Sequence, residues 1–88
     1  MTGQDQGKTA VALQYDGEGA PRVTAKGEGS LAEKIVETAK LHGVAIEEVP
    51  GLAEALSTVE LDAEIPVELY QAVAEVISYV MRMAQEAR

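Results

Sequence analysis

The chain has no cysteine, tryptophan or phenylalanine, and its three tyrosines make up the whole of its 3% aromatic content. Without cysteine it can have no disulfide scaffold, no thiolate metal site and no cysteine nucleophile, which fits a reducing compartment. Without Phe or Trp, a core has to be built from Val, Leu, Ile and Ala.

Basic residues are also scarce. The chain has seven Lys and Arg against 15 Asp and Glu, which gives a net charge of −8. Such a surface repels phosphate backbones and anionic lipid head groups, which disfavours nucleic-acid binding. The excess of carboxylates is typical of a solvated surface that keeps a protein soluble, and it favours basic partners.

Long hydrophobic runs are missing too, because no stretch approaches the roughly 20 apolar residues that a membrane span needs. The N-terminal residues 1–5 lack the basic region and apolar core of a signal peptide. We therefore expect a soluble, cytoplasmic protein.

What is present is the composition of one globular domain, with 88 residues, 47% hydrophobic and 25% charged. The polar, glycine-containing residues 1–8 predict a flexible N-terminal tail. We expect the folded domain to cover residues 9–84 and a short C-terminal tail to cover 85–88.

Three segments have the composition of β-strands. Residues 9–15 are apolar on both alternations except at Gln14, which is typical of a strand covered on both faces. After the turn-forming residues 16–21, residues 22–26 alternate, with Val23 and Ala25 inward. Residues 44–49 predict a short third strand. With helices between and after these strands, we expect a small α/β domain with a mixed sheet.

The first predicted helix begins with a capping box, in which the Ser30 hydroxyl accepts from the Glu33 backbone N–H and the Glu33 side chain reaches back. Gly43 supplies the left-handed position that ends this helix. Its expected buried stripe consists of Leu31, Ile35, Val36 and Ala39.

Two further helices are expected in the second half of the chain. A two-turn helix includes Leu52, Ala55 and Leu56, and residues 59–65 connect it to the last helix. Pro66 suits the first turn of that last helix, which we expect to end near Ala84. Its apolar residues recur at three- and four-residue spacing: Leu69, Tyr70, Val73, Ala74, Val76, Ile77, Val80 and Met81. Because this arc is wide, we expect part of it to be exposed as a small hydrophobic patch.

Residues that could carry chemistry are few. His42, the only histidine, falls in the last turn of the first helix, where an imidazole suits a capping role. The pairs Glu47-Glu48 and Asp62/Glu64 lack a metal-ligating frame. Gly7-Lys8-Thr9 matches the end of a phosphate-binding loop, but Thr2 stands where the pattern needs glycine and no strand precedes it. We expect no metal and no cofactor.

Several motifs follow one another in a recognisable order. They are Ala10-Val11-Ala12-Leu13-Gln14-Tyr15-Asp16, Ala20-Pro21-Arg22-Val23, Ala25-Lys26-Gly27, Ile65-Pro66-Val67-Glu68-Leu69-Tyr70 and Ala72-Val73-Ala74-Glu75-Val76. This series closely resembles the C-terminal cytoplasmic domain of the FlhB/YscU/SpaS family, the substrate-specificity switch proteins of flagellar and virulence type III secretion export gates. The resemblance runs from about Thr9 to Val80.

The chain departs from the family pattern at one functional motif. Family members cleave themselves within Asn-Pro-Thr-His, where the Asn side-chain amide attacks its own carbonyl carbon. By register, the four positions here are Asp5, Gln6, Gly7 and Lys8. Asp5 has no amide nitrogen to act as nucleophile, so we expect neither self-cleavage nor other enzymatic activity. The membrane domain and the strand before the motif are also missing, so the chain looks like a separately encoded counterpart of the fragment that cleavage releases.

The resemblance also implies a docking patch and partners. In the family, the cleaved fragment stays on the export gate and docks rod- and hook-type substrates at an apolar patch. By motif, that patch corresponds to Ala20, Pro21, Ala74 and Ile77. The missing first strand implies a free sheet edge at Thr9–Tyr15, which an export-gate protein of the FlhB family could complete. A free cytosolic carrier of export substrates and a vestigial structural domain are the alternatives.

Overall fold

An antiparallel hairpin forms the centre of the fold. The structure, a computed structural model, describes residues 8–86. Strands β1 (Thr9–Gln14) and β2 (Arg22–Glu28) pair from Thr9 opposite Glu28 to Gln14 opposite Arg22. The register shifts after Ala12, which leaves Thr24 as the extra residue of a bulge. Both predicted strands are confirmed, although β1 is half-buried rather than covered on both faces.

The predicted third strand at residues 44–49 is wrong. Within residues 8–86 the sheet has two strands, and residues 44–49 are irregular, with Val44 and Val49 exposed. One reason is that the end of the first helix takes the Val44 N–H, which donates to the Ala39 carbonyl at 2.9 Å. A short segment of strand-like composition does not form a strand without a backbone partner.

The outer edge of β2 is instead paired with a segment that the sequence presented as a connection. Arg22 and Glu64 form an antiparallel bridge. The Val23 N–H donates to the Ala63 carbonyl and the Ile65 N–H donates to the Pro21 carbonyl, both at 3.0 Å. Residues 62–65, which we call the edge segment, therefore close this side of the hairpin.

Helix α1 (Ser30–Leu41) begins without the predicted capping box. The N-cap is Gly29, with φ of 61°, and no side chain caps this end. The Gly29 N–H continues the hairpin ladder by donating to the Lys8 carbonyl, while the Gly29 carbonyl accepts from the Glu33 N–H. Because a glycine can make this left-handed transition from strand to helix directly, Ser30 is already helical and does not cap.

The other end of α1 agrees with the prediction. Gly43 has φ of 71° and donates to the Lys40 carbonyl, and together with the bond from Val44 this makes a Schellman motif. His42 is the C-cap residue, and its Nδ1 is 2.9 Å from the Thr38 carbonyl. The predicted capping role of His42 is confirmed.

The buried stripe of α1 differs from the predicted one at a single residue. Ala32 is buried, and Ile35, Val36 and Ala39 are half-buried, whereas Leu31 is exposed. Leu31 lies over β2 at Gly27, where an added Cβ would come within 2.5 Å of its Cγ. The absence of a side chain at Gly27 is what lets α1 approach the strand here.

We expect Gly27→Ala to destabilise the protein by about 1–3 kcal/mol through overpacking against Leu31. Urea unfolding followed by circular dichroism would measure the loss. In a Leu31→Ala background the same change is expected to cost much less, because the Cγ and Cδ2 atoms of Leu31 that it meets are gone. An equal loss in both backgrounds would contradict this explanation.

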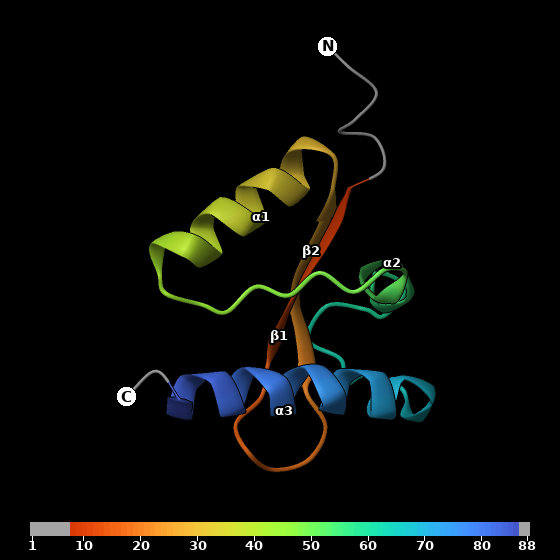
Figure 1. The fold of residues 1–88 in the computed structure, drawn as a ribbon. Helices are drawn as coiled ribbons and strands as arrows, with labels where there is room; N and C mark the ends of the chain where they lie inside the picture. The colour runs from red at the N-terminus through yellow and green to blue at the C-terminus, as the bar shows by residue number, and fades with distance from the viewer. Residues whose placement is uncertain (1–7, 87–88) are drawn as a thin grey trace.

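The second half of the chain contains helix α2 (Leu52–Leu56), the 3₁₀ turn η2 (Val67–Leu69) and helix α3 (Tyr70–Glu86). Pro66 was predicted inside the first turn of the last helix, but its extended ψ of 158° makes it the residue before η2. Figure 1 shows α1 beside one end of the hairpin and α3 crossing the other end, near the β1–β2 loop.

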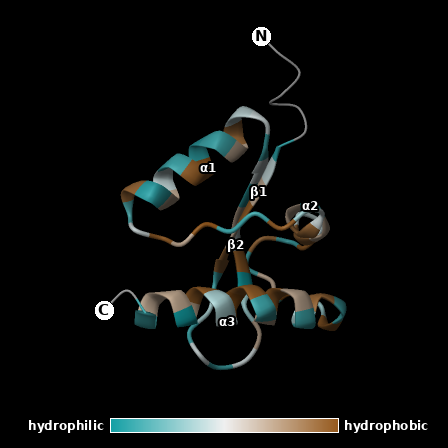
Figure 2. Cartoon of the chain, in the orientation of Figure 1, coloured by the Kyte–Doolittle hydropathy of each residue, from teal (hydrophilic) through white to brown (hydrophobic). Residues whose placement is uncertain are grey.

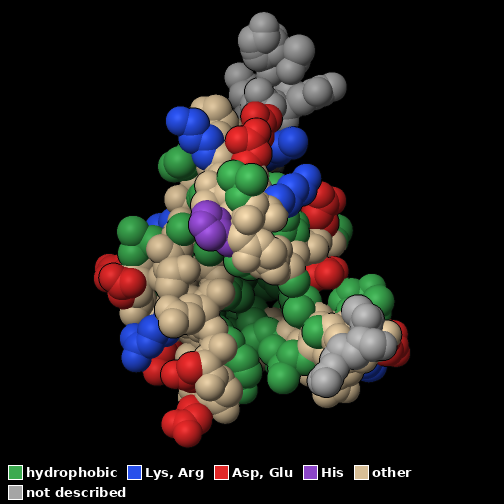
Figure 3. All heavy atoms as spheres, turned by 90° about the vertical axis from the view of Figure 1, so that its left-hand side faces the viewer, with side chains coloured by type: hydrophobic (Ala, Val, Ile, Leu, Met, Phe, Trp, Pro, Cys, Tyr) green, Lys and Arg blue, Asp and Glu red, His purple; other side chains and the backbone are tan. Residues whose placement is uncertain are grey.

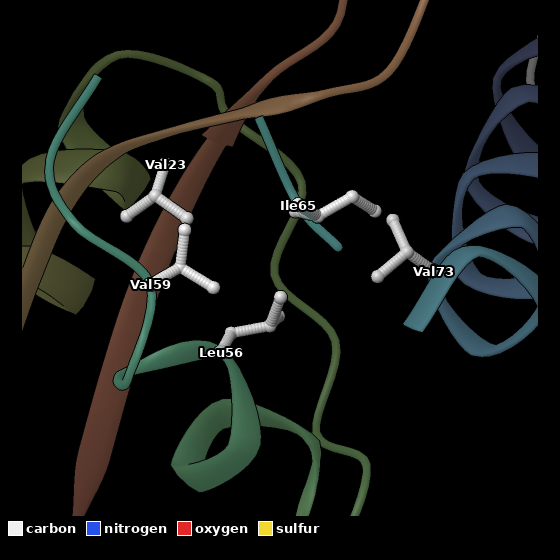
Figure 4. Close-up of a cluster of buried hydrophobic side chains, with 5 residues drawn as sticks. All are labelled: Val23, Leu56, Val59, Ile65 and Val73. Carbon is white, nitrogen blue, oxygen red and sulfur yellow. The ribbon is translucent and has the colours of Figure 1, made fainter. Parts of the chain in front are cut away.

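The core joins these parts. Val23, Leu56, Val59, Ile65 and Val73 form one buried cluster, drawn in Figure 4. The cluster contains only Val, Leu and Ile, as the absence of Phe and Trp predicts. Figure 2 shows hydrophobic stretches on α3 and on the parts of the strands that it crosses. Val73 and Ile65 therefore attach α3 to the hairpin.

Candidate docking groove

A groove of about 400 Å³ separates α3 from the β1–β2 loop. On the hairpin side it is lined by Tyr15, Gly17, Gly19, Ala20, Pro21 and Ile65, and on the helix side by Tyr70, Val73, Ala74, Ile77, Ser78 and Met81. All four residues of the predicted patch, Ala20, Pro21, Ala74 and Ile77, line this groove. The fold thus brings together two motifs that are more than fifty positions apart in the sequence.

The floor of the groove is continuous with the core. Pro21 is buried, and its carbonyl accepts from the Ile65 N–H of the edge segment. Ala20 and Ile77 are half-buried and pack against the core cluster. The core therefore holds both walls of the groove in place.

The rim of the groove is exposed and apolar. Tyr15, Tyr70 and Met81 expose 42%, 45% and 55% of their surface, although all three line the groove. Figure 3 shows hydrophobic side chains gathered in a hollow of this face, below the part that carries the purple His42. The prediction that part of the α3 stripe is exposed as a hydrophobic patch is confirmed.

Sequence reasoning found the helix wall better than the loop wall. Tyr70, Ala74, Ile77 and Met81 follow one another at helical spacing, so periodicity alone places them on one face. Tyr15 gives no comparable signal, because only the path of the β1–β2 loop brings it opposite α3.

A smaller polar hollow lies on the other side of the β1–β2 loop. It has a volume of about 160 Å³ and is lined by Gln14, Asp16, Glu18, Ala20, Arg22 and Glu64. The Arg22 guanidinium donates to the Asp62 carbonyl at 3.0 Å and is 3.9 Å from the Glu64 carboxylate. Ala20 lines both the polar hollow and the groove.

Three of the four residues that correspond to the family cleavage motif lie before residue 8, where the described part of the chain begins. Asp5, Gln6 and Gly7 are outside the described residues, whereas Lys8 is exposed and 3.9 Å from the Glu33 carboxylate. Thr9 opens a β-strand, while a phosphate-binding loop would lead into a helix at this point. The structure thus agrees with the rejection of Gly7-Lys8-Thr9 as a nucleotide site.

Within residues 8–86, no three His, Asp or Glu side chains gather as metal ligands. None of the helices in that range combines the length and the hydrophobicity that crossing a bilayer requires.

Comparison with known proteins identifies the family. The sequence model described as "FlhB HrpN YscU SpaS Family" matches residues 7–80. The chain belongs to this family. The family-level resemblance inferred from the motifs is therefore confirmed.

Two sequence relatives show how much of a family member the chain represents. The flagellar biosynthetic protein FlhB of Aquifex aeolicus (strain VF5) is 48% identical over 75 residues, which cover 82% of this chain and 21% of that protein. The chain thus spans about a fifth of the length of this relative. The uncharacterized protein YlqH of Bacillus subtilis (strain 168) is 39% identical over 83 residues, which cover 92% of this chain and 89% of YlqH.

Solved structures of the FlhB family have the same fold. The cytoplasmic domain of FlhB from Shewanella putrefaciens aligns with a TM-score of 0.79 at 42% identity, covering 91% of this chain and 69% of that one. The PscU C-terminal domain also gives a TM-score of 0.79, at 31% identity, covering 84% of this chain and 98% of that one. The predicted fold class, a small α/β domain like the FlhB cytoplasmic domain, is confirmed with two strands instead of three.

Proposed function

We propose that this FlhB-family chain is a non-enzymatic component of flagellar or type III protein export that docks on the export gate and helps to recognise export substrates. The observation that supports this most strongly is the groove. The four residues that the family resemblance assigns to a substrate patch line one apolar groove, although they come from a loop and a distant helix. The substrates would be flagellar rod- and hook-type proteins.

The free edge of β1 supports docking on the gate. β2 is paired on both sides, with β1 and with the edge segment. Within the described residues, β1 has a backbone ladder with β2 alone. An extended segment of an FlhB-family membrane protein could add to this edge by β-augmentation, which would place the chain at the cytoplasmic side of the inner membrane.

The test is titration calorimetry with two partners. One is the N-terminal cytoplasmic piece of the full-length FlhB-family protein from the same organism, and the other is a hook-type export substrate. Binding to the gate piece supports a stand-in gate subunit, and binding to the substrate alone supports the alternative of a free carrier. A folded protein that binds neither partner would overturn the proposal and leave the vestigial domain.

Ala74→Asp is expected to weaken substrate binding at least about tenfold, which corresponds to about 1.4 kcal/mol, because it places a charge in an apolar groove. Ala74 is exposed, so the fold should survive, and circular dichroism would confirm this. Ala84→Asp is the matched control, because Ala84 is an exposed residue of the same helix that does not line the groove. Equal losses in the two variants would count against the groove as the binding site.

A further inference from the structure

The β1–β2 loop divides its residues between two surfaces. Tyr15, Gly17 and Gly19 line the apolar groove, whereas Asp16 and Glu18 line the polar hollow behind it. The loop is thus a thin wall with an apolar side and an acidic side, and Ala20 lies at the point where the two meet.

Within residues 8–86, no basic side chain neutralises the two carboxylates of this wall. In that range Lys8 pairs with Glu33 and Arg22 pairs with Glu64, whereas neither Asp16 nor Glu18 has a basic partner. Asp16 accepts a hydrogen bond from the Glu18 backbone N–H at 3.0 Å, which fixes the turn but leaves both negative charges. Arg22 is already held by Asp62 and Glu64.

The wall carries no side chains at two of its positions. Gly17 and Gly19 have φ of 95° and 71°, and nothing lies within 4 Å of the position that a Cβ would take at either residue. Only backbone therefore separates the groove from the carboxylates at these positions. A long, flexible side chain that starts in the groove can pass over such a wall.

The charge around the groove limits what such a side chain can be. None of the residues that line the groove is basic, and the whole chain carries a net charge of −8. A basic side chain therefore meets no like charge in the groove.

The length of the groove indicates the size of what it can hold. The groove wall on α3 runs from Tyr70 to Met81, about 16 Å at roughly 1.5 Å per residue, which is the length of about five extended residues. A groove of this length accommodates a short extended segment of polypeptide.

We infer that the groove binds a short peptide segment that combines apolar anchors with a Lys or Arg, whose cation crosses the loop at Gly17 and Gly19 and pairs with Asp16 and Glu18. This inference rests on the proposed function of the groove and adds the charge of the segment that it recognises. Charge complementarity of this kind selects among segments of similar hydrophobicity.

The experiment uses an array of overlapping 15-residue peptides from the rod- and hook-type export substrates of the same organism. The whole chain is applied as wild type, as Ala74→Asp and as the double variant Asp16→Asn/Glu18→Gln. Peptides that wild type binds and Ala74→Asp does not are assigned to the groove. We expect these peptides to contain more Lys and Arg beside their apolar residues than the unbound peptides do.

Titration calorimetry with the peptide that binds the groove most tightly then measures how much the basic residue contributes to the affinity in solution. The double variant, and a peptide with its Lys or Arg replaced by Gln, are each expected to lose about three- to tenfold in affinity, with the loss shrinking as salt rises. Glu33 and Glu37 on α1 provide the control pair Glu33→Gln/Glu37→Gln, which changes the net charge equally but lies outside the groove and the polar hollow. This control should retain the affinity.

The possible failures are distinguishable. If groove peptides bind but carry no excess of basic residues, and the double variant binds them like wild type, the charge preference is overturned while the proposed groove function stands. If the double variant and the control lose affinity equally, the effect is one of net charge and the assignment to Asp16 and Glu18 is wrong. If wild type binds no peptide that depends on Ala74, both the groove function and this inference fail.

Discussion

Leu56→Ala is expected to destabilise the domain by about 3 kcal/mol, because large-to-small changes at buried leucines cost about 2–5 kcal/mol. Leu56 is only 3% exposed and ends the short helix α2 inside the core cluster. In Figure 4 its side chain lies between Val59 and the pair formed by Ile65 and Val73. Removing it leaves a cavity where the edge segment and α3 meet.

A loss of this size is a large part of the domain's total free energy of unfolding. Domains have unfolding free energies of about 0.05–0.15 kcal/mol per residue, which amounts to roughly 4–13 kcal/mol for this chain. Urea unfolding followed by tyrosine fluorescence would measure it. Leu61→Ala is the matched control, since Leu61 is 54% exposed, and it should cost less than about 1 kcal/mol. Equal losses at Leu56 and Leu61 would mean that the core does not lie where the structure places it.

Lys26→Met is expected to cost about 2 kcal/mol, although the substitution keeps most of the apolar stem. The Lys26 Nζ donates to two backbone carbonyls, those of Ser57 at 3.0 Å and Val59 at 2.6 Å. These carbonyls follow the C-terminal end of α2, where a cation is favoured. Hydrogen bonds from charged groups contribute about 1.5–3 kcal/mol, and their loss leaves part-buried acceptors unsatisfied.

The control for this change is Lys34→Met, which removes the same charge from an exposed position of α1. In the described part of the chain, Lys34 makes no hydrogen bond or ion pair. Thermal unfolding of the two variants side by side separates the role of the two carbonyls from that of net charge. If Lys34→Met is destabilised as much as Lys26→Met, the Lys26 contacts are not what stabilises the end of α2.

The elements that could be predicted from the sequence are those with a long or well-punctuated pattern. Helix α3 follows from an apolar repeat over more than three turns, and the hairpin follows from two β-type runs around a loop rich in glycine. The end of α1 was predictable because Gly43 is a strong local signal. Each of these inferences depends on neighbours in the sequence.

The predictions that were wrong or incomplete concern hydrogen-bond partners that are distant in the sequence. Residues 44–49 have the composition of a strand, but composition describes side chains and does not supply a partner for the backbone. Residues 62–65 belong to the stretch 59–65, whose sequence predicts a connection, and yet they pair with β2. The contact of Lys26 with carbonyls about thirty positions away is invisible to any local pattern.

The candidate site was only partly accessible from the sequence for the same reason. The family resemblance supplied Ala20 and Pro21, and together with helical spacing it supplied Ala74 and Ile77. That these residues form one groove, with Tyr15 and Met81 at its rim, follows from the way Val73 and Ile65 attach α3 to the hairpin. The acidic side of the loop depends on the path of the backbone, which turns alternate loop residues toward different surfaces.

The pairing of the edge segment with β2 has a consequence for how the protein is made. Pro21 and Val23 find their backbone partners some forty residues later, and Val23 reaches the core only together with Ile65 and Val73. During synthesis the hairpin and α1 leave the ribosome first, but by themselves they bury little apolar surface, because the residues that pair with Pro21 and Val23 and complete the core have not yet been made. The nascent chain should therefore remain unfolded until α3 emerges, so that the walls of the groove form in the same step as the core.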